Sequence, residues 1–147
     1  MNDGEPLLIL LVEDDPAHAA IVKRNLSSFR AANRIQHVAD GQAALDYLFH
    51  EAAFADPASS PRPHLMLLDL RLPKVDGLEV LKRVKAAPDL ATIPVVVLTT
   101  SAAEIDLVKA YQLGVGSYLV KPLDFDKFQG LMDAFGFYWL AWNQFPH

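Results

Sequence analysis

Residues 7–12 read Leu-Leu-Ile-Leu-Leu-Val, and three acids, Glu13, Asp14 and Asp15, follow them directly. An apolar run of six residues without polar alternation is typical of a parallel strand that is buried on both faces. Asp15 stands before Pro16, and this pair is favoured at a helix start, with the aspartate as cap and the proline in the first position. The stretch therefore predicts a buried strand that leads directly into a helix, with acidic side chains at the carboxyl end of the strand.

The same order of strand and helix recurs along the rest of the chain. Further strands are expected at Ile35–Ala39, Leu65–Leu68, Val95–Leu98 and Ser117–Val120, and further helices after caps at Asp40, Asp76 and Ser101 and from about Asp124. Ser101 and Glu104 have the spacing of a capping box, and Gly114 is placed to end that helix. Prolines, serines and small residues between Ala52 and Pro63 indicate a long loop before the third strand. This alternation predicts an α/β fold in which helices cover both faces of a five-stranded parallel sheet.

Length and composition narrow the class of protein. The chain has 147 residues, which predicts a single domain, and we divide it into a core at 6–135 and an extension at 136–147. A net charge of −5 without a basic run argues against nucleic-acid binding, and no stretch reaches the roughly 20 apolar residues that span a bilayer. The absence of cysteine excludes disulfides and thiolate chemistry and fits a cytoplasmic location.

Polar side chains end four of the predicted strands. Glu13 and Asp14 follow the first strand, Asp69 the third, Thr99 and Thr100 the fourth, and Lys121 the fifth. Each of them alone has an ordinary explanation as a turn, strand-end or solvated residue. In a parallel sheet, however, the carboxyl ends of the strands meet at one edge, where ligands bind. We therefore expect these side chains to form one site.

The chemistry of this set of side chains is coherent. Clustered carboxylates repel one another unless a cation compensates them, and Mg²⁺ prefers oxygen ligands such as carboxylates and phosphate. A lysine ammonium suits a phosphoryl oxygen, and a carboxylate can be the nucleophile that forms an aspartyl phosphate. Because phosphoryl transfer depends mainly on positioning and charge neutralisation, the strand ends predict this reaction, with Mg²⁺, Mn²⁺ or Ca²⁺ as the cofactor.

Four segments resemble the response regulator receiver family, namely Leu11–Asp15, Leu68–Gly77, Pro94–Thr100 and Tyr118–Pro122. The resemblance covers roughly residues 6–135 and implies a flavodoxin-like, doubly wound sheet with strand order 2-1-3-4-5. It also implies a single-domain response regulator that takes a phosphoryl group from a histidine kinase on Asp69 and signals to a partner protein by a conformational switch. Such a protein is not an enzyme beyond its own phosphorylation and dephosphorylation.

Two alternative functions start from the same aspartate. The chain could serve as a phosphorelay shuttle or a phosphate sink. It could instead be an aspartate-nucleophile phosphatase, but such enzymes carry a general acid two residues after the nucleophile, where this chain has Arg71. Without that acid, turnover should be poor, and the phosphatase is therefore the weaker alternative.

The resemblance also assigns roles to individual residues. It implies Glu13, Asp14, Asp69 and the backbone carbonyl of Arg71 as metal ligands, with Asp69 as phosphoacceptor. It implies Thr99 and Lys121 as further catalytic residues, Thr99 and Tyr118 as the switch, and a cis peptide bond before Pro122. We add Thr100, which follows Thr99 directly, to the catalytic residues. Thr100 departs from the usual family pattern, in which this position is most often a smaller residue such as alanine. We expect Thr100, together with Arg71 and Ser101, to influence the lifetime of the aspartyl phosphate.

The carboxyl-terminal segment is rich in aromatic residues. Phe128, Leu131 and Met132 have helical spacing and are expected to pack on the sheet. Beyond them, apolar residues fall on more faces than one stripe can bury, which predicts a homodimer interface. Its expected residues are Phe137, Tyr138, Trp139 and Trp142. A membrane-surface helix is disfavoured because no lysine or arginine follows Lys127. This segment and the long loop also resemble single-domain regulators that partner bacterial phytochromes, which implies a bacteriophytochrome as the kinase.

Overall fold

The strands in the described part of the chain form one parallel sheet. The structure is a computed structural model that describes residues 6–29 and 32–144, without the side chains of residues 125 and 136–144. The strands are β1 (Leu7–Val12), β2 (Asn33–Val38), β3 (Leu65–Asp69), β4 (Val95–Thr99) and β5 (Ser117–Val120). Their order is β2-β1-β3-β4-β5, and each neighbouring pair is parallel. The predicted five-stranded, doubly wound sheet is therefore confirmed.

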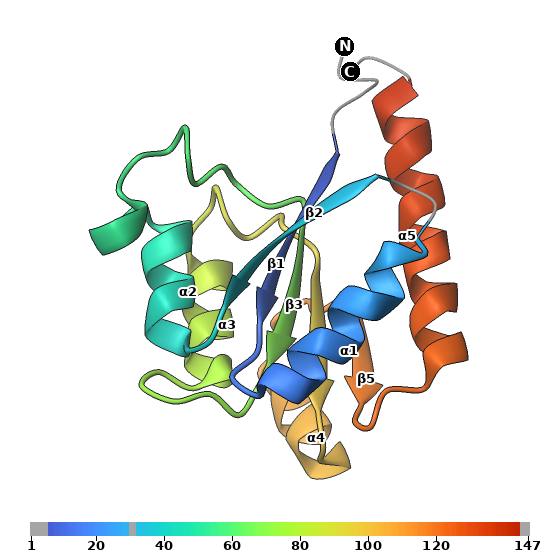
Figure 1. The fold of residues 1–147 in the computed structure, drawn as a ribbon. Helices are drawn as coiled ribbons and strands as arrows, with labels where there is room; N and C mark the ends of the chain where they lie inside the picture. Colours follow the sequence, from blue (N-terminus) through green and yellow to red (C-terminus); the bar gives the residue numbers. More distant parts are fainter. Residues whose placement is uncertain (1–5, 30–31, 145–147) are drawn as a thin grey trace.

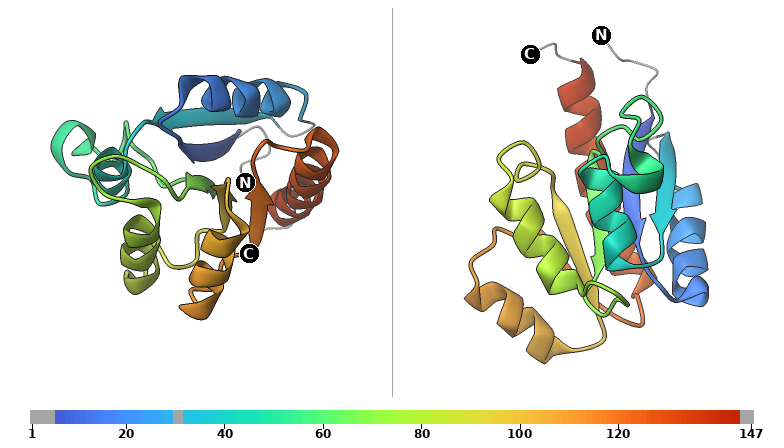
Figure 2. Two further views of the ribbon diagram at one scale, coloured as in Figure 1. Left: turned by 90° about the horizontal axis from the view of Figure 1, so that it is seen from below. Right: turned by 90° about the vertical axis from the view of Figure 1, so that its left-hand side faces the viewer.

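Helices cover both faces of this sheet, as expected. They are α1 (Pro16–Ser27), α2 (Gly41–Leu48), α3 (Gly77–Ala86), α4 (Ala102–Ala110) and α5 (Phe125–Gln144). Helices α1 and α5 lie on one face, and α2, α3 and α4 lie on the other (Figures 1 and 2). None of the helices in the described residues is long and apolar enough to cross a membrane.

Strand β1 shows why the apolar runs have no polar alternation. Leu7, Ile9 and Leu11 belong to the core cluster that contains residues of α1 and α5. Leu10 and Val12 belong to the opposite cluster, with residues of α2 and α3. Since side chains alternate between the faces of a strand, a strand with a core on each side must be apolar throughout.

The helices begin at the caps that the sequence predicts. The side chain of Asp15 accepts hydrogen bonds from the first turn of α1, Asp40 does the same for α2, and Asp76 for α3. Ser101 accepts from the amide of Glu104 at the start of α4. Each such cap contributes about 1 kcal/mol to helix stability, because it satisfies an amide that the helix itself leaves unpaired.

Some strand boundaries differ from the prediction. Strand β2 begins at Asn33 rather than at Ile35, because it pairs with β1 along the full length of that strand. Strands β3 and β4 each run one residue further than expected, so Asp69 and Thr99 lie within the ladder rather than in loops. The expected loop at 52–63 contains a short 3-10 helix, Ala52–Phe54, whose Phe54 ring makes an edge contact with Tyr47 at 5.2 Å.

Helix α4 ends earlier than the sequence predicts. It ends at Ala110, and the amides of Tyr111 and Gln112 tighten the last turn by donating to Val108 and Lys109. Gln112 takes the left-handed conformation, with φ at 53°, that a glycine would normally supply there. The prediction that Gly114 ends the helix is therefore wrong, because Gly114 lies in the connection to β5 beyond this turn.

Candidate functional site

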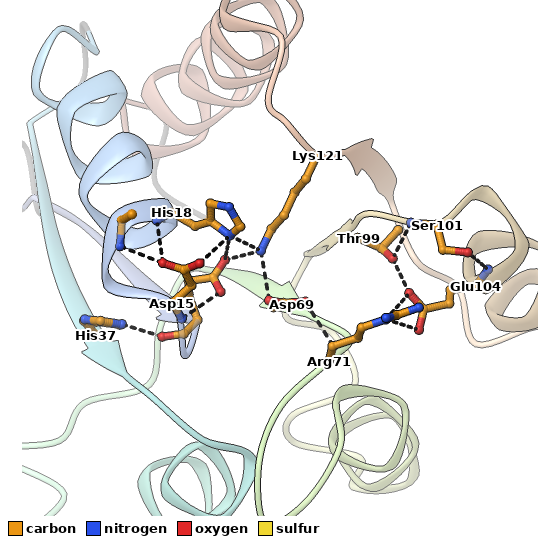
Figure 3. Close-up of polar contacts among 11 residues, drawn as sticks. Asp15, His18, His37, Asp69, Arg71, Thr99, Ser101, Glu104 and Lys121 are labelled. Atoms are coloured by element: carbon orange, nitrogen blue, oxygen red, sulfur yellow. Dashed lines mark hydrogen bonds and ion pairs between the residues drawn. The ribbon is translucent and has the colours of Figure 1, made fainter.

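The carboxyl ends of β1, β3 and β5 bring three charged side chains together. The ammonium of Lys121 lies 2.9 Å from Asp69 Oδ2 (Figure 3). It also donates to Glu13 Oε1. Glu13 is fully buried, while Asp69 and Lys121 are 5% and 8% exposed. The predicted convergence of distant strand ends into one pocket is therefore present for these residues. We call Glu13, Asp69 and Lys121 the lysine cluster.

Burial dominates the electrostatics of the lysine cluster. The pKa of Glu13 is raised from 4.5 to about 7, chiefly by burial and also by its interaction with Asp69, while Lys121 acts in the opposite direction. Burial by itself would lower the pKa of Lys121, but the hydrogen bonds to Glu13 and Asp69 outweigh this effect and raise it. One ammonium therefore stays charged between two carboxyl groups, and Glu13 holds its proton more readily than an exposed glutamate.

Three carboxyl groups at this edge have the spacing of a metal site. Oxygen atoms of Glu13, Asp14 and Asp69 all lie within 4.8 Å of one another. Asp14 is exposed, whereas the other two are buried. A site with oxygen ligands, an excess of negative charge and an open side suits Mg²⁺ or Mn²⁺, since Mg²⁺ keeps several of its waters when it binds a protein.

The loop after β3 is fixed close to Asp69. The amide of Arg71 donates to Asp69 Oδ1 at 3.0 Å, and the amide of Gly77 donates to Leu70 O at 2.9 Å. A Cβ atom on Gly77 would lie 2.3 Å from the carbonyl oxygen of Asp69, so this close approach requires glycine. The start of helix α3 is thereby packed against the backbone at the end of β3, and the Arg71 amide holds one oxygen of the Asp69 carboxylate.

Thr99 lies at the end of β4, but its hydroxyl group does not donate to Asp69. It donates to the carboxylate of Glu104 at 2.5 Å, and it accepts a hydrogen bond from the amide of Ser101 at 3.1 Å. Glu104 in turn accepts from Arg71 Nε at 3.2 Å (Figure 3). We call Thr99, Glu104 and Arg71 the threonine cluster.

The threonine cluster corrects one sequence prediction. A full capping box would place the Glu104 carboxylate on the amide of Ser101. That amide donates to Thr99 instead, and the Glu104 side chain binds Thr99 and Arg71. The prediction is right for the Ser101 cap and wrong for the reciprocal bond, because a neighbouring hydroxyl competes for the same amide.

The other predicted residues lie around these two clusters. Thr100 is exposed beside the end of β4, and Tyr118 is half-buried in β5, with the Lys109 ammonium 5.3 Å from its ring centroid. The peptide bond before Pro122 is cis, as expected. The predicted interface residues Phe137, Tyr138, Trp139 and Trp142 lie in the last turns of α5, and their side chains are outside the described residues.

Sequence reasoning missed two histidines at the lysine cluster. His18 Nδ1 lies 3.2 Å from Lys121 Nζ and 3.6 Å from Asp15 Oδ2. His37 Nε2 lies 2.8 Å from the backbone oxygen of Glu13. The signal for His18 was its place in the first turn of a helix that starts directly after the strand-end acids.

The chain matches the response regulator receiver domain over residues 9–133, and it therefore belongs to this family. It is 47% identical over 143 residues to the probable methanogenesis regulatory protein FilR2 of Methanothrix harundinacea (strain 6Ac), covering 97% of this chain and 89% of that protein. It is 41% identical over 145 residues to response regulator Rcp1 of Synechocystis sp. (strain ATCC 27184 / PCC 6803 / Kazusa), covering 99% and 97% of the two chains.

Solved structures agree with this assignment. The Mn²⁺-bound form of Rcp1 superposes with a TM-score of 0.76, at 41% identity, over 92% of this chain and 95% of that one. The phosphorylated cyanobacterial phytochrome response regulator RcpA gives a TM-score of 0.77 at 36% identity, over 93% and 96% of the two chains. The predicted likeness to phytochrome-associated regulators is therefore confirmed.

Proposed function

We propose that this protein is a single-domain response regulator in which Asp69 accepts a phosphoryl group from the phosphohistidine of a sensor kinase. The observation that carries the proposal is the lysine cluster, with Lys121 Nζ 2.9 Å from Asp69 Oδ2 beside two further carboxyl groups. The near-complete overlap with Rcp1, at 99% and 97% of the two chains, supports the single-domain form. We place the reaction in the cytoplasm.

In the proposed reaction, an oxygen of the Asp69 carboxylate attacks the phosphorus atom. A bond from this oxygen to phosphorus forms as the bond from phosphorus to the kinase histidine nitrogen breaks, and the nitrogen keeps the electron pair. The Arg71 amide and the Lys121 ammonium hold the two oxygens of Asp69, so the nucleophile is oriented before the donor arrives. Because the Lys121 ammonium already lies beside the acceptor oxygen, it can also bind an oxygen of the transferred phosphoryl group and neutralise its negative charge.

Residues at this edge fit a divalent cation. Glu13, Asp14 and Asp69, with the backbone carbonyl of Arg71, would hold Mg²⁺ or Mn²⁺, which supplies positive charge to the phosphoryl oxygens. The Mn²⁺-bound structure of Rcp1 supports this assignment. Burial and the neighbouring Asp69 raise the pKa of Glu13, so a second negative charge is unfavourable there, and a bound cation would offset this cost.

We further propose that phosphorylation changes the positions of Thr99 and Tyr118 and thereby the surface of α4, β5 and α5. Similarity to RcpA supports a phytochrome-type histidine kinase as the phosphodonor. The aromatic residues near the end of α5 would form a homodimer interface. Sedimentation at increasing concentration tests the interface, since a chain truncated after Phe135 should remain monomeric; a dimer of unchanged affinity would contradict this assignment.

Phosphorylation with a small donor tests the central proposal. Incubation with acetyl phosphate and Mg²⁺ should add one phosphoryl group to the wild-type chain and none to Asp69→Asn, as measured by intact mass. Asp76→Asn is the matched control, because asparagine also caps α3 and the acceptor is unchanged. A phosphoryl group that persists in Asp69→Asn would refute Asp69 as the acceptor.

A further inference from the structure

The hydroxyl group of Thr99 uses its proton in a hydrogen bond to Glu104 in this structure. It donates to Glu104 Oε1, and its oxygen accepts from the amide of Ser101. Thr99 is only 1% exposed, so water does not compete for these contacts. A threonine hydroxyl has a single proton, and a carboxylate or a phosphoryl oxygen can only accept one. Thr99 therefore cannot donate to Glu104 and to a phosphoryl group on Asp69 at the same time.

We infer that Glu104 is a positioning residue that holds Thr99 in its unphosphorylated arrangement. The inference rests on the proposed function and deepens it, since it names the bond that phosphorylation must break. The proton stays on the Thr99 oxygen throughout and changes its acceptor from the Glu104 carboxylate to a phosphoryl oxygen. The free energy of the Thr99–Glu104 hydrogen bond therefore opposes the movement of Thr99, and the interaction of Thr99 with the phosphoryl group must exceed it.

Arg71 makes this exchange feasible. Its guanidinium contacts both carboxylate oxygens of Glu104, at 3.2 and 3.3 Å, so Glu104 keeps a partner when Thr99 leaves. The Glu104 side chain is 27% exposed and that of Arg71 is 68% exposed. Both residues line a groove of about 360 Å³ between α3 and α4, which leaves the carboxylate room to move.

The position of Arg71 links the two clusters through one residue. Its amide binds Asp69 Oδ1, while its side chain binds Glu104. Arg71 therefore contacts both the residue whose charge would change, Asp69, and the residue whose partner would change, Glu104. A loop shift at Arg71 would accordingly affect the Thr99 acceptor, whereas the cap of α4 at Ser101 can stay in place.

Binding of beryllium trifluoride, a stable mimic of the phosphoryl group, measures this competition at equilibrium. At fixed Mg²⁺, Glu104→Gln should bind the mimic more tightly than the wild-type chain, and Glu104→Ala more tightly still, by about tenfold, because loss of a charge-assisted hydrogen bond frees Thr99. The ¹⁹F signal of the bound mimic gives the dissociation constant. The Thr99 methyl resonance of unliganded Glu104→Ala should shift towards its position in the liganded wild-type chain.

Glu79→Ala is the matched control. Glu79 occupies the same third position of α3 that Glu104 occupies in α4, and it likewise pairs with an arginine, Arg83, at 2.9 Å. Its removal should leave the dissociation constant within about twofold of wild type, since an exposed pair has little effect. Urea unfolding of each variant verifies that it is folded, and Glu104→Gln serves if the alanine variant is not.

The same comparison in a Thr99→Val background separates the inference from simple charge repulsion. Without the hydroxyl, replacing Glu104 should no longer tighten binding. A tenfold gain that persists in Thr99→Val would show that Glu104 acts by its charge, and equal binding by Glu104→Ala and wild type would show that it does not hold Thr99; either result overturns the inference. A wild-type chain that fails to bind the mimic would refute the proposed function as well, so the two failures are distinguishable.

Discussion

The lysine cluster and the threonine cluster lie at the same edge of the sheet but differ in burial. All three side chains of the lysine cluster are at most 8% exposed. The threonine cluster extends from a buried hydroxyl to an arginine whose side chain is 68% exposed. Removing the partner of a buried charged group lowers the free energy of unfolding much more than removing the partner of an exposed one, because water cannot take the place of the lost partner. The comparison fits the two proposed roles, namely a fixed site for phosphoryl transfer and a more exposed set of contacts that changes on phosphorylation.

The largest expected effect follows from removing the ammonium of the lysine cluster. Lys121→Met should destabilise the protein by about 3–5 kcal/mol at pH 8, because it leaves buried carboxylates without their counter-ion. At pH 5 the loss should be smaller, since the raised pKa of Glu13 allows its carboxyl group to be protonated there. Urea unfolding at both pH values measures the difference.

Lys109→Met is the control for this variant. The Lys109 ammonium lies over the Tyr118 ring at 5.3 Å, and its removal should cost about 1 kcal/mol or less. If Lys121→Met were no more destabilising than Lys109→Met, the lysine cluster would not depend on its ammonium, and the contrast between the two clusters would fail.

The second prediction concerns the pH dependence of stability in the presence of a chelator. The folded-state pKa of Glu13 is raised from 4.5 to about 7, chiefly by burial, so the folded protein binds a proton that the unfolded chain releases between these values. The resulting stability is fully present below pH 4.5 and is lost as the pH rises through 7, by about 3 kcal/mol from this group.

Glu13→Gln tests whether this group is responsible. Glutamine keeps the shape and cannot titrate, so the fall in unfolding free energy between pH 4.5 and 7 should flatten relative to wild type. Glu104→Gln, in the more exposed cluster, is the comparison and should leave most of that fall intact. An unchanged slope in Glu13→Gln would mean that burial does not control this carboxyl group.

Local sequence signals were enough for most of the fold and for the lysine cluster. The apolar run 7–12 and the cap at Asp15 each depend on neighbouring residues alone, and the structure has both where they were expected. The convergence of Asp69 and Lys121 could also be predicted, because a parallel sheet brings the carboxyl ends of its strands to one edge.

The threonine cluster could not be predicted in the same way. The Thr99 hydroxyl and the Glu104 carboxylate compete as acceptors for the Ser101 amide, and the partner of Glu104 depends on which of them binds it. Interatomic distances decide this competition, and the spacing of residues in the sequence does not reveal them. The end of α4 is similar. Among the described residues of α4, Val108 alone is buried, so little packing defines that helix, and the turn at Gln112 ends it before the glycine.

The smallest expected effect belongs to the exposed end of the threonine cluster. A double-mutant cycle of Arg71→Ala and Glu104→Ala should give a coupling energy of about 0.2–1 kcal/mol in thermal unfolding, as is usual for exposed ion pairs. In 1 M salt this coupling should nearly vanish, because the Debye length falls to about 3 Å, close to the 3.2 Å that separates the two groups. The Thr99–Glu104 bond, which is partly buried, should keep its coupling energy in salt, as the cycle of Thr99→Val and Glu104→Ala would measure. A strong, salt-insensitive Arg71–Glu104 coupling would mean that the threonine cluster is held as firmly as the lysine cluster. The contrast between a fixed lysine cluster and an exchangeable threonine cluster would then be wrong.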